Sequence, residues 1–376
     1  MKTLLKILIA CFISIKIVNG QTQVITMTTS LPVGSSITFS LLENKDIAII
    51  NVDFGDGNLI SKWMDFSSGR AEVTGTLVGS QTVKVYSAFV DKIYEFICEY
   101  QQLTSIDISN AKDLKLLICG YNNLTDLNVT NNPKLTTLWC NNNELSSLNI
   151  TQNIVLESFT CSYNKLTSLD VINNTTLLWF YCSYNQLTFN TLPIKKQSWL
   201  SYIYAPQQSI QIAKDFNVSD ELDLNDQLLV NGFTTNYVLK TTTGSILFQT
   251  TDYSLTDGKI TFLKAQSDSV YCIMENDAFP DFTGDNVFKT TNSKISSTTD
   301  VLNSHERKVK IYSIDRVIYI ETPEKQGITI YDFHGRKLFS QYLQSKIATL
   351  QIDNPGIYFV QISGNNGTSI KKVIVK

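Results

Sequence analysis

The chain has 376 residues, enough for several domains with buried cores, and its formal net charge is -3 at pH 7. The near balance of 31 basic and 34 acidic residues argues against nucleic acid or an anionic membrane as the main partner. Only two histidines occur, His305 and His334, so most of the chain lacks the commonest general base and metal ligand. The composition therefore disfavours an enzyme.

The first twenty residues are typical of an export signal. A basic start is followed by an apolar stretch, and the compact residues Val18 and Gly20 precede a mature start that we predict near Gln21. Lysines interrupt the apolar stretch, which makes it too short to span a membrane. A lipoprotein signal ending before Cys11 is the competing interpretation. We therefore predict an exported protein that is not an integral membrane protein.

Residues 21–92 alternate apolar and polar positions between glycine-containing turns, which predicts a small β-domain that caps the repeats following it. The motif VDFGDG at 52–57 resembles the short signature of β-sandwiches of the polycystic-kidney-disease type. We interpret it as a hairpin turn in which Asp56 and Gly57 supply the positive φ values. A calcium site formed by Asp53 and Asp56 is the alternative, although their spacing lacks the ligand series of an EF-hand loop.

The spacing of the cysteines is the strongest signal in the chain. Six cysteines follow the export signal, and an even number in an exported protein usually indicates disulfides. The first five instead recur at a constant interval, since each sequence number exceeds the one before it by 21: Cys98, Cys119, Cys140, Cys161 and Cys182. Repetition at this period predicts a solenoid, here over residues 93–194.

Each repeat has two halves, L-x-x-L-x-C-x-x-N-x and L-x-x-L-x-V-x-x-N-x-x. Leu135, Leu138 and Cys140 share one face of a short extended segment, which stacked coils would bury in a continuous core. We expect the cysteines to form a ladder of free, buried thiols, because parallel Cβ vectors on neighbouring coils suit a disulfide poorly; bridges are the alternative. Inside the bends we expect side-chain amides to bond backbone groups of the next coil, at Asn122, Asn143, Asn164 and Asn185, with a second column at Asn132, Asn153 and Asn174.

These repeats resemble the short leucine-rich repeats, containing Asn and Cys, of secreted Bacteroidetes proteins, with some kinship to internalin-like repeats. The fold class that we predict is mainly β: a leucine-rich repeat solenoid flanked by small β-sandwich domains.

Residues 195–289 contain strand-like runs separated by turn signals, and DSVYC at 268–272 is similar to the Tyr-Cys strand of immunoglobulin folds. No partner cysteine lies upstream in this segment, so we expect an Ig-like β-sandwich without the inter-sheet disulfide. Residues 290–308 are rich in Ser and Thr and are predicted to be a linker.

Residues 309–376 are again rich in predicted strands. The elements IYDFHGRKL (330–338), PGIYFV (355–360) and KKVIVK (371–376) resemble a type IX secretion (Por secretion) sorting domain of the A type. The resemblance implies a small sandwich that the outer-membrane export machinery reads and often cleaves, after which the cargo is anchored to surface glycolipid or released. The residues that carry the match are Tyr331, Asp332, Gly335, Arg336, Gly356 and Tyr358.

Positions that flank the buried residues of the repeats face outward and vary between copies. Aromatic residues exposed on one side of a solenoid are what a peptide- or glycan-binding surface needs. The candidate ligand-binding residues on this face are Trp139, Trp179, Tyr181, Ile118 and Thr160. A structural role is equally open for the three aromatic residues. A bend column of Tyr121, Tyr163 and Tyr184, interrupted by Asn142, is interpreted as side chains that stack along the coils.

The sequence contains no nucleophile elbow, phosphate loop, zinc pair or dinucleotide fingerprint, and the two histidines fall in the linker and in the sorting domain. We therefore expect no enzyme activity, no cofactor and no metal. We predict an exported protein, secreted or displayed on the outer-membrane surface after passing the periplasm, that is handled by the type IX machinery and binds a protein or peptide ligand through its repeats. A glycan-binding adhesin, or a structural envelope protein without a discrete ligand, is the alternative.

Overall fold

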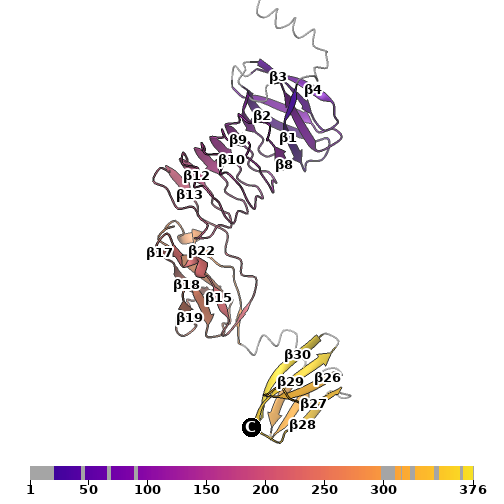
Figure 1. The fold of residues 1–376 in the computed structure, drawn as a ribbon, viewed down its shortest axis with the longest axis vertical. Helices are drawn as coiled ribbons and strands as arrows, with labels where there is room; N and C mark the ends of the chain where they lie inside the picture. Colours follow the sequence, from indigo (N-terminus) through magenta and orange to yellow (C-terminus); the bar gives the residue numbers. More distant parts are fainter. Residues whose placement is uncertain are drawn as a thin grey trace, which may run out of the picture. The chain divides into compact units, whose positions relative to one another are not determined.

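The structure, a computed structural model, has regular secondary structure that is almost entirely β-strand, and it divides into two compact units, Met1–Ile295 and Ser296–Lys376 (Figure 1). The predicted signal at 1–20 lies outside the described residues. These comprise residues 21–43, 47–65, 69–88, 92–297, 310–314, 316–321, 327–342, 347–364 and 367–375.

The first domain packs two sheets face to face. Its strands are β1 (Thr22–Thr29), β2 (Ser36–Glu43), β3 (Ile47–Asp53), β4 (Leu59–Asp65), β5 (Ala71–Thr76) and β6 (Thr82–Ser87). One sheet has the order β4-β3-β6-β1-β8, and the other begins β5-β2-β7. The apolar residues that alternate along β1, β2 and β6 point into the core between the sheets.

The first coil of the solenoid supplies one strand to each of these sheets. Strand β7 (Ile93–Ile97) pairs antiparallel with β2 and parallel with the next coil, while β8 (Leu103–Asp107) pairs antiparallel with β1. The backbone groups at this end of the solenoid are therefore hydrogen-bonded rather than left at an open sheet edge. The first domain caps the repeats through continuous sheets.

The VDFGDG motif forms the turn between β3 and β4. The Asp53 carboxylate accepts hydrogen bonds from the backbone N–H groups of Gly55 (2.8 Å) and Gly57 (2.9 Å). Positive φ values occur at these two glycines and not at Asp56, which corrects the expected placement. A Cβ at Gly55 would collide with the Ser80 carbonyl oxygen, so this position requires glycine. Both acidic side chains of the motif serve the turn, since Asp56 accepts from Asn58.

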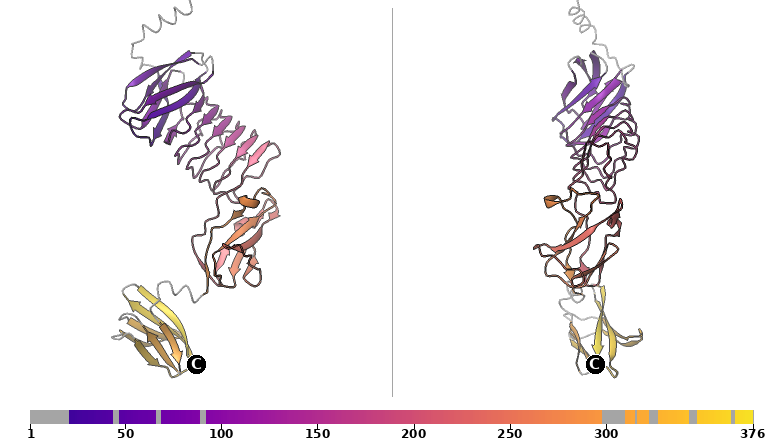
Figure 2. Two further views of the ribbon diagram at one scale, coloured as in Figure 1. Left: turned by 180° about the vertical axis from the view of Figure 1, so that it is seen from behind. Right: turned by 90° about the vertical axis from the view of Figure 1, so that its left-hand side faces the viewer.

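Five short parallel strands continue the second sheet along the repeats: β9 (Leu116–Ile118), β10 (Thr137–Trp139), β11 (Ser158–Thr160), β12 (Trp179–Tyr181) and β13 (Ser201–Ile203). They pair in register, one strand per coil, as the stacked arrows in Figure 2 show. The middle residue of each strand points inward and is buried, for example Leu138 and Phe159.

The solenoid extends beyond the predicted boundary at 194. Strand β13 pairs with β12, and Tyr202, Tyr204 and Gln207 occupy the positions held by Phe180, Cys182 and Asn185 in the coil before. These residues fall one position later than the regular interval of the repeats, and this shift, together with the change of residue types, conceals the last coil in the sequence. The prediction that the sandwich begins at 195 is therefore wrong.

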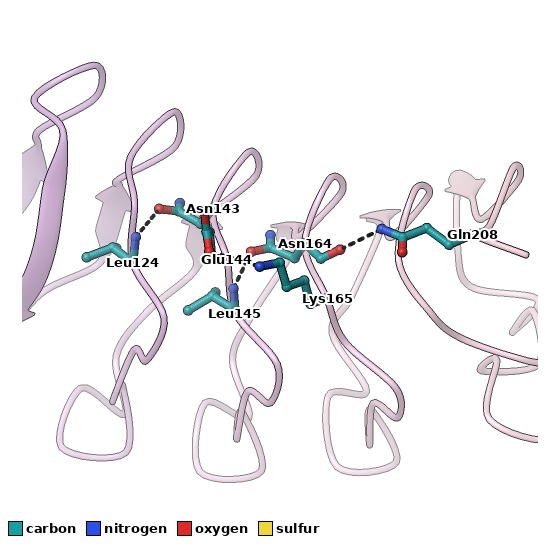
Figure 3. A network of polar contacts seen from close by, with 7 residues as sticks. All are labelled: Leu124, Asn143, Glu144, Leu145, Asn164, Lys165 and Gln208. Atoms are coloured by element: carbon teal, nitrogen blue, oxygen red, sulfur yellow. Dashed lines mark hydrogen bonds and ion pairs between the residues drawn. The ribbon is translucent and has the colours of Figure 1, made fainter. Parts of the chain in front are cut away.

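Buried amides connect successive coils inside one bend (Figure 3). Asn143 donates from Nδ2 to the carbonyl oxygens of Cys119 (3.0 Å) and Cys140 (3.1 Å) and accepts from the backbone N–H of Leu124 (3.0 Å). Asn122, Asn164 and Asn185 make the corresponding bonds to the preceding coil. Each amide bonds the preceding coil, not the next one as predicted, because the bend turns its side chain toward the N-terminal end.

The second column of asparagines fills the opposite bend. Asn132, Asn153 and Asn174 are fully buried, and each donates to two carbonyl oxygens of the preceding coil, as Asn153 does to Val129 (3.0 Å) and Asn132 (2.8 Å). The two columns together supply partners for bend backbone groups that no strand can reach.

The five repeat cysteines are buried and unbridged, as is Cys272. Burial raises the pKa of every ladder thiol, in the case of Cys119 to about 12. Neutral thiols in this position act as small apolar side chains between the leucine and phenylalanine layers.

Small, mostly antiparallel sheets build the region after the solenoid. Its strands are β14 (Phe216–Asn217), β15 (Glu221–Asp223), β16 (Leu229–Val230), β17 (Phe233–Thr234), β18 (Asn236–Thr241), β19 (Tyr253–Thr256), β20 (Lys259–Phe262), β21 (Val270–Glu275), β22 (Phe288–Lys289) and β23 (Ile295–Ser296), with one-turn 3-10 helices η2 (Asn225–Gln227) and η3 (Gly284–Asn286). An aromatic cluster joins this region to the last coils, where Phe189 contacts Phe279, Phe282 and Phe288. The hydrophobic core is therefore continuous from the first domain to this region.

The predicted linker begins later than residue 290. Thr290, Ser293 and Ile295 are buried, and β23 pairs with β14. The Ser- and Thr-rich composition of this stretch conceals its burial and the strand at Ile295–Ser296; the Thr290 hydroxyl, for example, accepts a hydrogen bond from the Cys272 backbone N–H (3.0 Å). Residues 298–309, with His305, lie outside the described residues.

The second unit contains two sheets that enclose one core. One sheet has the order β24 (Lys310–Ile314), β25 (Val317–Glu321), β28 (Ile347–Gln351), and the other has the order β27 (Lys337–Tyr342), β26 (Gly327–Asp332), β29 (Gly356–Gly364), β30 (Gly367–Val375). Ile318 and Ile320 from one sheet and Ile330 and Val360 from the other belong to this core. It is a small β-sandwich.

We predict that Asn164→Ala destabilises the solenoid strongly. The substitution removes the acceptor of the buried Leu145 N–H, and a buried unpaired group costs about 1–3 kcal/mol. It also removes one hydrogen bond from each of the Cys140 and Cys161 carbonyls, which keep Asn143 and Asn185 as donors, and each lost bond costs about 0.5–1.5 kcal/mol. The free energy of unfolding, measured by urea titration, should fall by at least about 2 kcal/mol. The matched control is Asn173→Ala at an exposed bend position, where a change within about 0.5 kcal/mol is expected. Equal losses in both variants would contradict the role of the ladder.

We also predict that stability falls as the pH rises above about 8.5, the ordinary pKa of a thiol. The ladder thiols stay neutral in the folded protein, because burial raises their pKa, but they ionise in the unfolded chain. The stabilising effect is complete below the unfolded pKa and is lost toward the folded one. Urea titrations between about pH 8 and 10 measure the slope, which should be shallower in Cys140→Ala. Identical slopes would show that the thiols do not contribute.

Candidate binding face of the solenoid

The outward residues of the parallel strands form two columns on one face of the sheet. Side chains alternate across a strand, so the residues before and after each buried middle position point away from the core. The first column is Leu116, Thr137, Ser158, Trp179 and Ser201, and the second is Ile118, Trp139, Thr160, Tyr181 and Ile203.

A shallow groove with a volume of about 1040 Å³ runs over these columns. The side chains along most of it are apolar, aromatic, hydroxyl or amide groups. The charged residues in its lining are Arg70 from the first domain and Glu99 from the first coil. Arg70 is in turn paired with Glu95. The groove therefore offers hydrogen bonds and apolar contact, with little charge along most of its length.

The two predicted tryptophans lie on this face and are partly exposed, Trp139 by 41% and Trp179 by 40%. Trp139 leans over the sheet, since its indole N–H donates to the Ser158 hydroxyl (3.1 Å) on the next strand. Tyr181 and Thr160 are half-buried members of the second column. All five predicted contact residues, with Ile118, thus line one groove.

Ile118 does not meet the expectation of an exposed contact residue. Its side chain is only 8% exposed, although it reaches the groove lining. In the register of the sheet it lies between Ile97 and Trp139. Burial at this position depends on neighbours from other coils and cannot be read from the repeat pattern.

Stacked tyrosines line the bend beside the groove. Tyr163 and Tyr184 stack with ring centroids 4.1 Å apart, and Tyr100 and Tyr121 with centroids 4.4 Å apart. Asn142 occupies the position between these two pairs. Tyr100 belongs to the degenerate first copy and was not part of the predicted column, although the regular interval that separates it from Tyr121 indicates it.

Residues of the concealed last coil complete the face. Ile203 lines the groove and is 46% exposed, and Leu200 precedes its strand with an exposure of 68%. Sequence reasoning missed both, because the period changes before them. The last coil becomes recognisable in the sequence when Trp199 is aligned with Leu177, which lies one position further away than the regular interval of the repeats.

Within the described residues we searched for side chains that could bind a metal ion and for helices that could span a membrane. Among these residues, no group of three or more His, Cys, Asp or Glu side chains is placed to hold a metal ion. No helix in this part of the chain is both long and apolar enough to cross a bilayer.

The sorting-motif residues gather at one end of the second unit. Asp332 accepts hydrogen bonds from the backbone N–H groups of His334 (3.0 Å) and Arg336 (2.9 Å) and pairs with the Arg336 side chain (3.0 Å). These bonds lower the pKa of Asp332, chiefly through the Arg336 backbone N–H. Gly335 completes the turn with a φ of 79°, which favours glycine.

The segment that includes Gly356 and Tyr358 faces the same turn. Tyr358 is the register partner of Asp332, and its hydroxyl donates to the Asn354 carbonyl (2.7 Å). A pocket of about 520 Å³ is lined by both segments, including Asp332, Arg336, Gly356 and Tyr358. Tyr331 points elsewhere and donates to the side-chain oxygen of Gln361 (2.9 Å).

Comparison with known families identifies the second unit. Residues 314–376 match the family described as secretion system C-terminal sorting domain. This match supports export of the protein by type IX secretion and handling of its tail by that machinery. No curated protein matches the chain.

Solved structures with similar parts include the functional domain of InlJ from Listeria monocytogenes, described as including a cysteine ladder. It shares 16% identity with a TM-score of 0.24, covering 54% of this chain and 62% of that one. Domains 3 and 4 of rat CD4 share 14% identity with a TM-score of 0.20, covering 45% of this chain and 100% of theirs.

Proposed function

We propose that the protein is an exported, non-catalytic binding protein whose solenoid face contacts a protein or peptide ligand through Trp139, Trp179, Tyr181 and Thr160. The observation that carries this proposal is the pair of tryptophans, 41% and 40% exposed, on a groove with little charge. Large aromatic side chains gain most by leaving water, and they dominate the binding energy of protein interfaces.

The packing of the repeats supports a binding role for these side chains rather than a purely structural one. The middle position of each strand already fills the core, with Phe159 and Phe180 fully buried and stacked at 5.5 Å. The outward positions are free to vary without loss of the core. Trp139 and Trp179 therefore add little to core packing where they lie.

A neutral glycan is the second candidate ligand. It is favoured by the hydroxyl and amide groups of the groove, which come from Thr137, Asn141, Ser158 and Thr160. These groups can exchange hydrogen bonds with sugar hydroxyls, while the tryptophan faces offer apolar contact.

Display at the cell surface, or release from it, is the destination that we propose. The sorting domain supports export, and the Bacteroidetes-type assignment of the repeats is part of the same proposal.

We expect the double substitution Trp139→Ala and Trp179→Ala to abolish ligand binding without unfolding the protein. The removed side chains are partly exposed, so little stability is lost, whereas truncation of interface hot spots costs at least about 2 kcal/mol, or more than tenfold in affinity. Pull-down of cell-surface proteins, followed by titration of each retained protein, measures the effect.

Trp63→Ala is the matched control, because Trp63 is an exposed tryptophan (51%) of the first domain that does not line the groove. It should bind as the parent does. A glycan array with the same three proteins tests the second candidate. If the double variant keeps every ligand of the parent, the proposed face is wrong.

Deletion of residues 309–376 should leave the protein in the periplasm, because the second unit carries the match to the sorting family. The deletion leaves the first unit intact, so its loss from the surface cannot be attributed to misfolding of the repeats. Immunoblots of periplasmic, surface and medium fractions give the distribution. Normal surface appearance of the shortened protein would refute the sorting role.

A further inference from the structure

The column of tyrosines in the solenoid bend has one missing ring. Equivalent positions in successive coils are Tyr100, Tyr121, Asn142, Tyr163 and Tyr184. All five have left-handed φ values, from 55° to 59°, which shows that tyrosine is compatible with the backbone at this position. The conformation of the bend therefore does not explain why the third ring is absent.

The gap has the dimensions of one aromatic ring. Neighbouring rings in the column are 4.1 to 4.4 Å apart, close to the spacing of about 4.8 Å between strands. Tyr121 and Tyr163, which belong to coils two steps apart, are then separated by roughly 9–10 Å. A planar group midway would meet both rings at about the centroid distance that stacked aromatic pairs prefer.

Amides rather than a ring occupy the third coil. Asn141 donates from Nδ2 to Oδ1 of Asn142 (2.9 Å), which holds the two side chains together. Gly120 in the coil before leaves room for Asn141, since a Cβ there would lie 3.0 Å from Oδ1 of Asn141.

The gap opens onto the binding groove. Tyr121, Asn142 and Tyr163 belong to the same groove lining as Trp139, which lies in the same coil as Asn142. The two tyrosines are 43% and 47% exposed. A ligand on the sheet face therefore reaches the gap without any change of the backbone.

We propose that the gap between Tyr121 and Tyr163 is a binding slot for one uncharged aromatic side chain of the protein ligand, which completes the tyrosine column. This inference rests on the proposed function, because it assigns the chemistry of one contact of that ligand.

Charge and shape favour this occupant. The walls and floor of the slot, formed by Tyr121, Tyr163, Asn141 and Asn142, carry no formal charge, so a neutral group matches them. Two parallel ring faces give a flat group stacking on both sides, a geometry that stabilises aromatic pairs beyond their area burial. A branched aliphatic side chain lacks the planar faces that this double stack needs.

The test uses N-acetyl-L-phenylalaninamide as the probe, with N-acetyl-L-leucinamide as the aliphatic control and methyl β-glucoside as the sugar control. NMR titration of the full protein follows the ring protons of the tyrosines. We expect the aromatic probe to shift Tyr121 and Tyr163 upfield while Tyr100 and Tyr184 move less. The aliphatic and sugar probes should leave these signals in place.

Asn142→Tyr should fill the slot with the missing ring and lower the affinity for the aromatic probe by on the order of tenfold or more. Asn142→Ala is the matched control, because it leaves the slot open and should keep the binding. If Asn142→Tyr does not fold, Tyr163→Ala replaces it, since loss of one wall should weaken binding as well. Binding that is unchanged in Asn142→Tyr, or shifts produced by the sugar instead of the aromatic probe, would overturn the proposal.

The two proposals fail in different ways. If the slot variants have no effect but Trp139→Ala with Trp179→Ala abolishes ligand capture, the slot is refuted and the binding face stands. If the aromatic probe occupies the slot while the tryptophan variant captures every ligand normally, the slot exists and the proposed main face is wrong.

Discussion

The hydrogen-bonding of the bends is the constraint on which the rest of the structure depends. Strand pairing satisfies only a short segment of each coil, and the chain turns sharply on either side of it. The turned backbone is buried between coils, where an unpaired carbonyl or N–H costs about as much as several good contacts contribute. In one bend each asparagine supplies both a donor and an acceptor, so the column of Asn122 to Asn185 holds the coils at one spacing, while the asparagines of the opposite bend act as donors.

A stack built in this way has two exposed ends, and the structure treats them differently. At the N-terminal end, β7 and β8 join the two sheets of the first domain, so hydrogen bonds continue from the solenoid into its cap. At the C-terminal end, Gln207 takes the role of the ladder asparagine by donating to the Cys182 carbonyl (2.8 Å), and the Phe189 cluster covers the last coils. One end is completed by backbone pairing and the other by side chains.

Because the core and the bends carry the stability, the outward face of the strands can vary from coil to coil. Two departures from the repeat consensus fall in the coil at 135–144, which has Trp139 on the sheet face and Asn142 in place of a tyrosine. Both departures line the same groove. Residues that can change without loss of stability are free to serve ligand recognition. The coil at 135–144 therefore contributes to both proposals.

The sequence by itself determined the solenoid, its period, the buried cysteine and asparagine positions and the sorting domain. These features are local or periodic, so each repeat displays the same inward residues and the motif of the tail is contiguous. Only the tertiary structure decided that Ile118 is buried, that the coil of Tyr202 and Gln207 belongs to the solenoid, and that Ile295–Ser296 form a strand. It also decided which coil each asparagine bonds and that one ring is missing between Tyr121 and Tyr163. The physical reason is that the burial of a residue, its pairing partner and the space beside it depend on residues from other coils and domains. The residue spacing within one segment does not show which of these distant residues come close in space.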